Sequence, residues 1–297
     1  MKKSIPYVIL SMIILLTSCS AVDLRPDQLR SGNISNAEQR GREFLTECKL
    51  AMGYDKLENM DVYETTTTYI WNPGWLLMPM NPFPGNNGKD VQLRFATNSF
   101  DGQIEYLEGR KKGDIVGLQS WKGYKIKKDK NNLKLHEHDR YLWGLATFHY
   151  LVEAPVHLPQ AEIVRFAGQK EFNGINYDLV YVTWGSEEPN KDYDRFLVYV
   201  NPKTKFIDLI EATINDYFLP MPKGMQHATV QYDRSETSIG AHLPTRSVIQ
   251  LKSPKKRKRY VYYYEMRDYR FDSFDRDELY PIDDVPYFGL SKTTEKE

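Results

Sequence analysis

Short runs of β-branched, aromatic and aliphatic residues recur along the chain, and the segment from residue 177 to residue 214 holds three of them in succession. These runs are Tyr177–Trp184, Arg195–Val200 and Lys205–Ile214. Stretches rich in Gly, Ser, Pro and Asn separate them and indicate turns. Short connections favour antiparallel pairing, because parallel strands need a long crossover. The segment therefore predicts a three-stranded antiparallel meander.

Both faces of this predicted meander carry apolar side chains. Leu179 and Tyr181 point to one face, whereas Val180 and Val182 point to the other. A sheet that is apolar on both faces needs a covering layer on each face, or a hydrophobic ligand on one of them.

Similar runs elsewhere predict further strands, several of them joined by Gly-containing hairpin signals. The expected strands are Asp61–Trp71, Val91–Phe100, Gln103–Glu108, Ile115–Trp121, Tyr124–Lys128, Ala161–Phe172, Met225–Arg234, Thr245–Leu251 and Tyr260–Phe271. The 13% content of aromatic residues also suits strands better than a helical bundle. We expect a mainly β (α+β) fold, a single curved antiparallel sheet or incomplete β-barrel wrapped around one or two helices.

Two segments change to the helical period. The first begins at Ser35 or Asn36, runs to about Ala51 and is closed by Gly53. The second, Asp139–Val152, is apolar around most of its circumference. A mostly apolar helix in a β-rich chain is expected to lie against the concave face of the sheet.

The N-terminus has the pattern of a bacterial export signal. Two lysines precede the apolar run Ile5–Leu16, which is too short to span a membrane. The run ends in Leu16-Thr17-Ser18-Cys19, which resembles the lipobox of bacterial lipoproteins. This resemblance implies a signal peptide over residues 1–18 and attachment of fatty acyl chains such as palmitate to Cys19. Because Ser20 rather than Asp follows the cysteine, it also implies anchoring to the outer membrane.

The rest of the chain is expected to form one domain. Residues 19–35 are polar and without periodicity, which predicts a tether between the lipid and the domain. The domain itself is expected over residues 36–272, followed by a polar C-terminal tail over residues 273–297.

One loop combines prolines with apolar side chains. Residues 72–88 contain four prolines, which exclude a regular helix or a central strand. Two interpretations stay open, a plug folded over the core or an apolar loop that contacts a membrane or covers a cavity. In the second interpretation the membrane contacts are Trp75, Leu76, Leu77 and Phe83.

The lipobox, the N-terminal helix, the apolar mid-chain helix and the meander YDLVYVTW…DRFLVYVNPKTKFIDLIEATI occur together in one chain. This combination resembles the periplasmic lipoprotein-carrier superfamily of LolA and LolB. The resemblance implies a half-open antiparallel barrel over about residues 36–272, which wraps apolar helices and leaves a hydrophobic cavity. We expect Trp143, Phe148, Trp184 and Phe196 near the lining of that cavity. The chain is longer than these carriers, and its loop is richer in proline.

Motifs for catalysis and cofactor binding are not found in the sequence. No P-loop, dinucleotide fingerprint, zinc-protease helix or serine-hydrolase elbow is present. His136-Glu137-His138-Asp139 has metal-ligating residue types, but a site needs further ligands that spacing does not name. Equal totals of 40 basic and 40 acidic residues give no argument for nucleic acid. We therefore predict no cofactor, no metal site, no catalytic residue and no nucleic-acid partner.

The basic run Lys255–Arg259 and the tyrosines after it leave alternatives open. The cations could meet lipid phosphates, or they could form a solvated hairpin tip. The leading function is a non-enzymatic, lipid-anchored envelope protein that binds a lipid or acyl chain. The alternatives are an accessory lipoprotein that binds glycan or protein through exposed aromatic residues, and a hydrolase without a recognisable motif. The sequence names no protein partner.

Overall fold

The computed structural model describes residues 21–75, 83, 87–128, 133–136, 139–215, 223–283 and 285. The predicted signal peptide, the lipid attachment site Cys19 and the loop residues Leu76 and Leu77 lie outside these residues.

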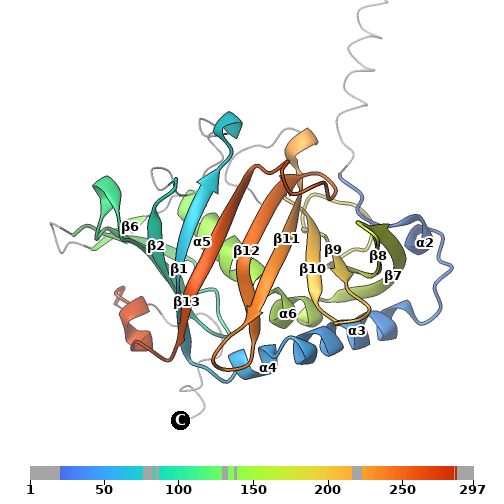
Figure 1. Ribbon diagram of the computed structural model, residues 1–297, viewed down its shortest axis with the longest axis horizontal. Coiled ribbons are helices and arrows are strands. Elements are labelled where there is room, and N and C mark those ends of the chain that lie inside the picture. Colours follow the sequence, from blue (N-terminus) through green and yellow to red (C-terminus); the bar gives the residue numbers. More distant parts are fainter. Residues whose placement is uncertain are drawn as a thin grey trace, which may run out of the picture.

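Thirteen strands of the described chain form one sheet, in which every neighbouring pair is antiparallel (Figure 1). The spatial order is β6-β5-β4-β3-β2-β1-β13-β12-β11-β10-β9-β8-β7. The strands are β1 (Val62–Trp71), β2 (Asp90–Ala96), β3 (Gly102–Tyr106), β4 (Ile115–Gln119), β5 (Lys122–Ile126), β6 (Leu133–His136), β7 (Ile163–Phe172), β8 (Ile175–Thr183), β9 (Phe196–Val200), β10 (Ile207–Thr213), β11 (His227–Glu236), β12 (His242–Leu251) and β13 (Tyr262–Phe271). The predicted single curved antiparallel sheet is confirmed.

The sheet does not close, and its two edge strands, β6 and β7, follow each other in the chain. The connection between them consists of three helical segments, α5 (Asp139–Val152), α6 (Ala154–His157) and the 3-10 turn η3 (Leu158–Gln160). Helix α5 has the predicted bounds and packs against β3, β4 and β5, inside the curve of the sheet (Figure 1). Within the described residues, no helix combines the length and apolar character that crossing a bilayer requires.

The two apolar faces of the β8–β10 meander belong to two different cores. Val180 and Val182 pack into the large core on the concave side, together with α5 and α6. Leu179 and Tyr181 pack into a smaller cluster on the opposite face. The alternation predicted from the sequence is confirmed, and both faces have a covering layer.

The cover of the second face is the segment that we expected to be a tether. Residues 22–30 form an N-terminal arm, whose last four residues are the short helix α2 (Asp27–Arg30), beside β7 and β8 (Figure 1). Its side chains Leu24 and Leu29 are only 6% and 7% exposed, in contact with the smaller cluster. Residues 22–30 of the expected tether therefore pack on the domain, and the burial of the two leucines favours this position.

The arm is also held by polar and steric contacts. Arg25 Nη1 lies 2.5 Å from Glu188 Oε1, which joins the arm to the loop between β8 and β9. Gly168 lies at the bulge of β7 with φ +93°, and a Cβ there would overlap the side chain of Gln28. Glycine at this position permits both the backbone conformation and the close seating of the arm.

Two more helices lie along one end of the sheet, α3 (Ala37–Ala51) and α4 (Tyr54–Leu57). The predicted first helix is confirmed in α3, and Gly53 after it has φ +70°. Gly41 of α3 lies so close to β7 that an added Cβ would be 2.7 Å from the backbone nitrogen of Phe166. This contact fixes α3 against the strand, because no larger residue fits between them without a shift of the backbone.

Two segments differ in extent from the prediction. The expected strand Val91–Phe100 ends at Ala96, because Asn98 adopts φ +58° and turns the chain toward β3. The expected polar tail from residue 273 continues the fold through the 3-10 turn η5 (Arg276–Leu279). Ile282 and the side chain of Gln119 exchange two hydrogen bonds of 3.0 and 3.1 Å, which fasten the end of the described chain beside β4.

Candidate functional site

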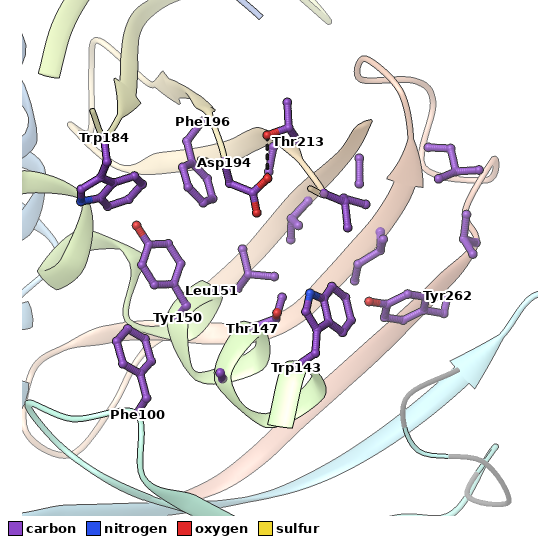
Figure 2. A pocket seen from close by; sticks show the side chains of 18 of the residues that line it. Phe100, Trp143, Thr147, Tyr150, Leu151, Trp184, Asp194, Phe196, Thr213 and Tyr262 are labelled. Atoms are coloured by element: carbon purple, nitrogen blue, oxygen red, sulfur yellow. Dashed lines mark hydrogen bonds between the residues drawn. The ribbon is translucent and has the colours of Figure 1, made fainter. Parts of the chain in front are cut away.

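A cavity of about 260 Å³ lies between α5 and the concave face of strands β9 to β13 (Figure 2). Its walls are mostly aromatic and aliphatic. The aromatic residues are Trp71, Phe100, Trp121, Trp143, Tyr150, Trp184, Phe196 and Tyr262. Among the described residues that line it, none is Lys, Arg or His, and Asp194 is the one acid. The cavity therefore suits an apolar molecule or an apolar part of a larger one.

One face of α5 forms a wall of the cavity. The residues that it contributes are Trp143, Ala146, Thr147, Tyr150 and Leu151. Their spacing of i, i+3, i+4, i+7 and i+8 places all five on one side of the helix. The opposite side of α5 packs into the core, with Leu145 and His149 fully buried. The helix therefore divides its apolar circumference between core and cavity.

Small side chains on two adjacent strands create the empty volume. Ala212 of β10 and Ala228 of β11 are paired directly across the strands, and both line the cavity. Two alanines side by side leave space above the sheet that the larger side chains of valine or isoleucine would fill. Val230 and Ile249 continue the same wall on β11 and β12.

One end of the cavity carries polar groups. Asp194, just before β9, points into this end near Tyr150, Trp184 and Phe196 (Figure 2). Its Oδ1 accepts hydrogen bonds of 2.8 Å from Thr213 Oγ1 and from the backbone nitrogen of Asn215. Two such donors fix the orientation of the side chain and suit the carboxylate form.

Two residues that line the cavity carry a hydrogen-bond donor without a partner among the described residues. The hydroxyl of Tyr150 and the indole N–H of Trp71 are both buried and form no hydrogen bond there. Burial, and then the nearby charge of Asp194, raise the pKa of Tyr150, so its hydroxyl stays protonated at neutral pH. Trp71 stacks on Tyr262, with ring centroids 4.5 Å apart. Other buried hydroxyls of the described chain, such as those of Tyr69 and Tyr264, also lack a partner there. A ligand or water that accepts a hydrogen bond in the cavity would satisfy the donors of Tyr150 and Trp71.

A cluster of titratable side chains lies behind the cavity wall. His149 Nε2 is 2.7 Å from Glu153 Oε1, and His157 Nε2 is 3.4 Å from Glu153 Oε2. Burial alone would raise the pKa of Glu153, but the two histidines outweigh it and hold the pKa at about 2. The side chains of His149 and Glu153 are 0% and 2% exposed, so no substrate reaches them in this arrangement. Phe100 stacks on His157 at 4.9 Å and separates the cluster from the cavity.

The predicted cavity residues fall into two places. Trp143, Trp184 and Phe196 line the cavity together, although they come from α5, the end of β8 and the start of β9. Phe148 lies on another side of α5 and packs against Tyr264 at a ring-centroid distance of 4.4 Å. The structure therefore assigns Phe148 to the core rather than to the main cavity.

The sequence did not point to several of the residues that line the cavity. Phe100 reaches it from a turn that we expected to be strand, and Asp194 reaches it from the loop before β9. The i, i+3, i+4, i+7 spacing on α5 was available in the sequence. The Ala212–Ala228 pair was not, because it depends on the register of two strands.

The loop after β1 is described only in part. Phe83 is 1% exposed and packs against Tyr69 with ring centroids 5.7 Å apart. The predicted membrane contact is therefore wrong for Phe83, because its side chain belongs to the core. Trp75 is half-buried at the end of the 3-10 turn η1 (Pro73–Trp75).

The structure describes the two charged motifs of the sequence to different extents. Within His136-Glu137-His138-Asp139, Glu137 and His138 and the side chains of the other two residues lie outside it. Among the described residues, no group of three or more His, Cys, Asp or Glu side chains is arranged to hold a metal ion. Within the basic run, Arg257 pairs with Asp233 at 2.5 Å.

Several solved structures resemble this chain distantly. No family model matches the chain, and no curated protein matches its sequence. A DUF1329 family protein of Desulfovibrio piger is similar in structure, with a TM-score of 0.48, 10% identity and coverage of 82% of this chain and 96% of that one. A LolA superfamily protein of Nitrosomonas europaea gives a TM-score of 0.48, 10% identity and coverage of 84% and 99%.

A third similar structure comes from Vibrio parahaemolyticus and is a domain whose expected role is outer membrane lipoprotein sorting. Its TM-score is 0.48, at 9% identity, with coverage of 82% of this chain and 97% of that one. At these identities the likeness concerns the fold alone, and the function has to be argued from the cavity.

Proposed function

We propose that this protein is a lipid-anchored component of the bacterial cell envelope that binds one apolar chain, a lipid or an acyl chain, in the cavity beside α5. The observation that supports the proposal is an apolar cavity of about 260 Å³ beside α5. Cavities in protein interiors are few, and each costs stability through the contacts it forgoes. A cavity built by a cross-strand pair of alanines fits a binding role better than a packing defect.

The dimensions and chemistry of the cavity agree with this ligand class. Pockets for drug-sized molecules are typically about 300–1,000 Å³, so this volume suits one slender chain. Removal of apolar surface from water contributes about 25 cal/mol per Å², which favours a long hydrocarbon. The accessory-lipoprotein alternative expects a filled core and an exposed aromatic row, whereas Trp143, Trp184 and Tyr262 face the cavity (Figure 2).

The anchor follows from the lipobox at Cys19, and it would hold the cavity close to a membrane that supplies such ligands. Several acyl chains on one cysteine anchor a protein stably, whereas a single chain does not. We place the protein at the outer membrane because Ser20 follows the cysteine. The binding reaction as proposed involves no cofactor and no catalytic step.

A variant that fills the cavity tests this function. Ala228→Leu adds bulk at the cavity wall, opposite Ala212. We expect it to abolish saturable binding of an apolar dye such as Nile red to the protein carrying Cys19→Ala, while the melting temperature stays within a few degrees. Ala51→Leu, which adds the same bulk at an exposed position of α3, is the matched control. Undiminished binding by folded Ala228→Leu protein would show that the dye binds elsewhere and that the cavity is not the site.

A further inference from the structure

We infer that the cavity selects acyl ligands whose polar group is uncharged, such as an ester or amide carbonyl, over ligands that bring a carboxylate or a phosphate into it. This inference rests on the proposed function and names the class of ligand. It derives from the polar end of the cavity, where Tyr150 and Asp194 face the same space (Figure 2).

The first argument is the charge of the lining. An anion that leaves water for an apolar site needs a cation or several donors to replace its hydration. Among the described residues that line this cavity there is no Lys, Arg or His. The charged side chain that lines it is Asp194, which repels a second anion. A carboxylate drawn into the cavity would therefore be destabilised twice, by lost hydration and by like charge.

The second argument is the hydrogen bonds that the lining offers. The Tyr150 hydroxyl and the Trp71 indole N–H are buried donors without a partner among the described residues. Trp71 is 3% exposed, so solvent does not satisfy its donor in place of a ligand. A carbonyl oxygen accepts a hydrogen bond without carrying a charge. An ester or amide carbonyl therefore brings no charge into the cavity and can accept a hydrogen bond, whereas an alkane can accept none.

The third argument is that the polar end is held in place. Thr213 Oγ1 donates to Asp194 Oδ1 and accepts from the backbone nitrogen of Arg195, both at 2.8 Å. Thr183 Oγ1 donates to the backbone oxygen of Asp194 at 2.9 Å. These bonds tie the acid to the ends of β8 and β10. The carboxylate of Asp194 therefore cannot swing away to admit an anionic head without breaking its hydrogen bonds to Thr213 and Asn215.

The test compares three ligands of similar length at neutral pH, namely methyl laurate, laurate and tridecane. Each is used to displace Nile red from the full chain carrying Cys19→Ala. We expect methyl laurate to displace the dye at about a tenfold lower concentration than laurate, which corresponds to about 1.4 kcal/mol. Laurate is also better hydrated in free solution, so the response of this gap to mutation is the decisive measurement.

Asp194→Asn keeps the Oδ1 acceptor for Thr213 and Asn215 but removes the negative charge. We expect it to narrow the gap between ester and acid to about threefold or less, mainly through tighter binding of laurate. The exposed Asp192→Asn, two residues away, is the matched control and should leave the gap unchanged. An unchanged gap in Asp194→Asn would overturn the selection by charge.

Tyr150→Phe removes the donor and leaves the ring. We expect displacement by methyl laurate to weaken by about two- to tenfold, the range of one net hydrogen bond, while displacement by tridecane stays unchanged. Tyr193→Phe, at an exposed tyrosine outside the cavity, is the control. Equal effects on ester and alkane would refute the role of the hydroxyl.

If neither the dye nor tridecane binds, the proposed function itself fails. If both bind without preference for the ester, this inference alone fails.

Discussion

The N-terminal arm offers a sharp test of how the fold is stabilised, through the substitution Leu29→Ala. Leu29 is 7% exposed, within the cluster that covers the outer face of β8 and β9. Leucine has three more carbon groups than alanine, and each buried group contributes about 0.8 kcal/mol. Burial of these three groups therefore contributes about 2.4 kcal/mol to the stability of the fold. A further loss of stability depends on how far the arm relaxes into the space that the leucine side chain leaves. Replacement of a buried leucine by alanine lowers the free energy of unfolding by about 2–5 kcal/mol in total.

Equilibrium unfolding in urea measures this loss, because a change in midpoint at constant slope reports stability. Leu50→Ala is the matched control, since Leu50 lies on α3 with 59% of its surface exposed. We expect the control to change the free energy of unfolding by less than about 0.5 kcal/mol. If Leu29→Ala behaves like Leu50→Ala, the arm contributes no stability and the segment is a tether after all.

Three further predictions follow from other parts of the chain. Cys19→Ala should abolish incorporation of labelled fatty acid, and persistent labelling would refute the lipobox. Because the folded pKa of Glu153 is about 2 against an ordinary 4.5, its contribution to stability is complete above pH 4.5 and is lost as the pH falls toward 2. The free energy of unfolding, measured in urea at several pH values, should therefore depend less on pH in this window in Glu153→Gln than in the unchanged protein. The difference in slope is at most about 1.4 kcal/mol per pH unit. An unchanged slope would contradict the lowered pKa of Glu153. Replacing Leu76 and Leu77 with Ser should weaken liposome binding of Cys19→Ala protein without a loss of stability, whereas a loss of several kcal/mol would identify a plug.

The strands and the central helix could be predicted because each carries its signal locally. The alternation of Leu179 with Val180 assigns both residues to faces without knowledge of any other strand. The arm could not be predicted in this way, because Leu24 and Leu29 are isolated apolar residues in a polar segment. Their partners, such as Tyr181, lie about 150 residues away in the chain, and no local pattern marks such a contact. The same reason explains why residues 273–282 resembled a polar tail.

The aromatic lining of the cavity could be predicted in part for a related reason. Large apolar residues such as Trp143, Trp184 and Phe196 are conspicuous in a sequence, and a half-open barrel has few places for them. Such residues are as common in cores as in cavities, however, and Phe148 shows the difference, because it lies on a side of α5 that packs against β13. Only the rotation of the helix distinguishes the two places, and the stripe through Thr147 and Leu151 fixes that rotation.

A cavity is defined by the side chains that are small, and small residues carry little signal. Ala212 and Ala228 are ordinary alanines in ordinary strands, and each would be compatible with a filled core if it faced a large residue. The register of β10 against β11 places them opposite each other, so that neither compensates for the size of the other. Packing normally removes such a space, because each lost contact reduces stability. Two alanines stand opposite each other in a cavity that Trp71 and Tyr150 also line, and the donors of these two residues have no partner in the described part of the chain. Together these features are the physical reason to expect a ligand there.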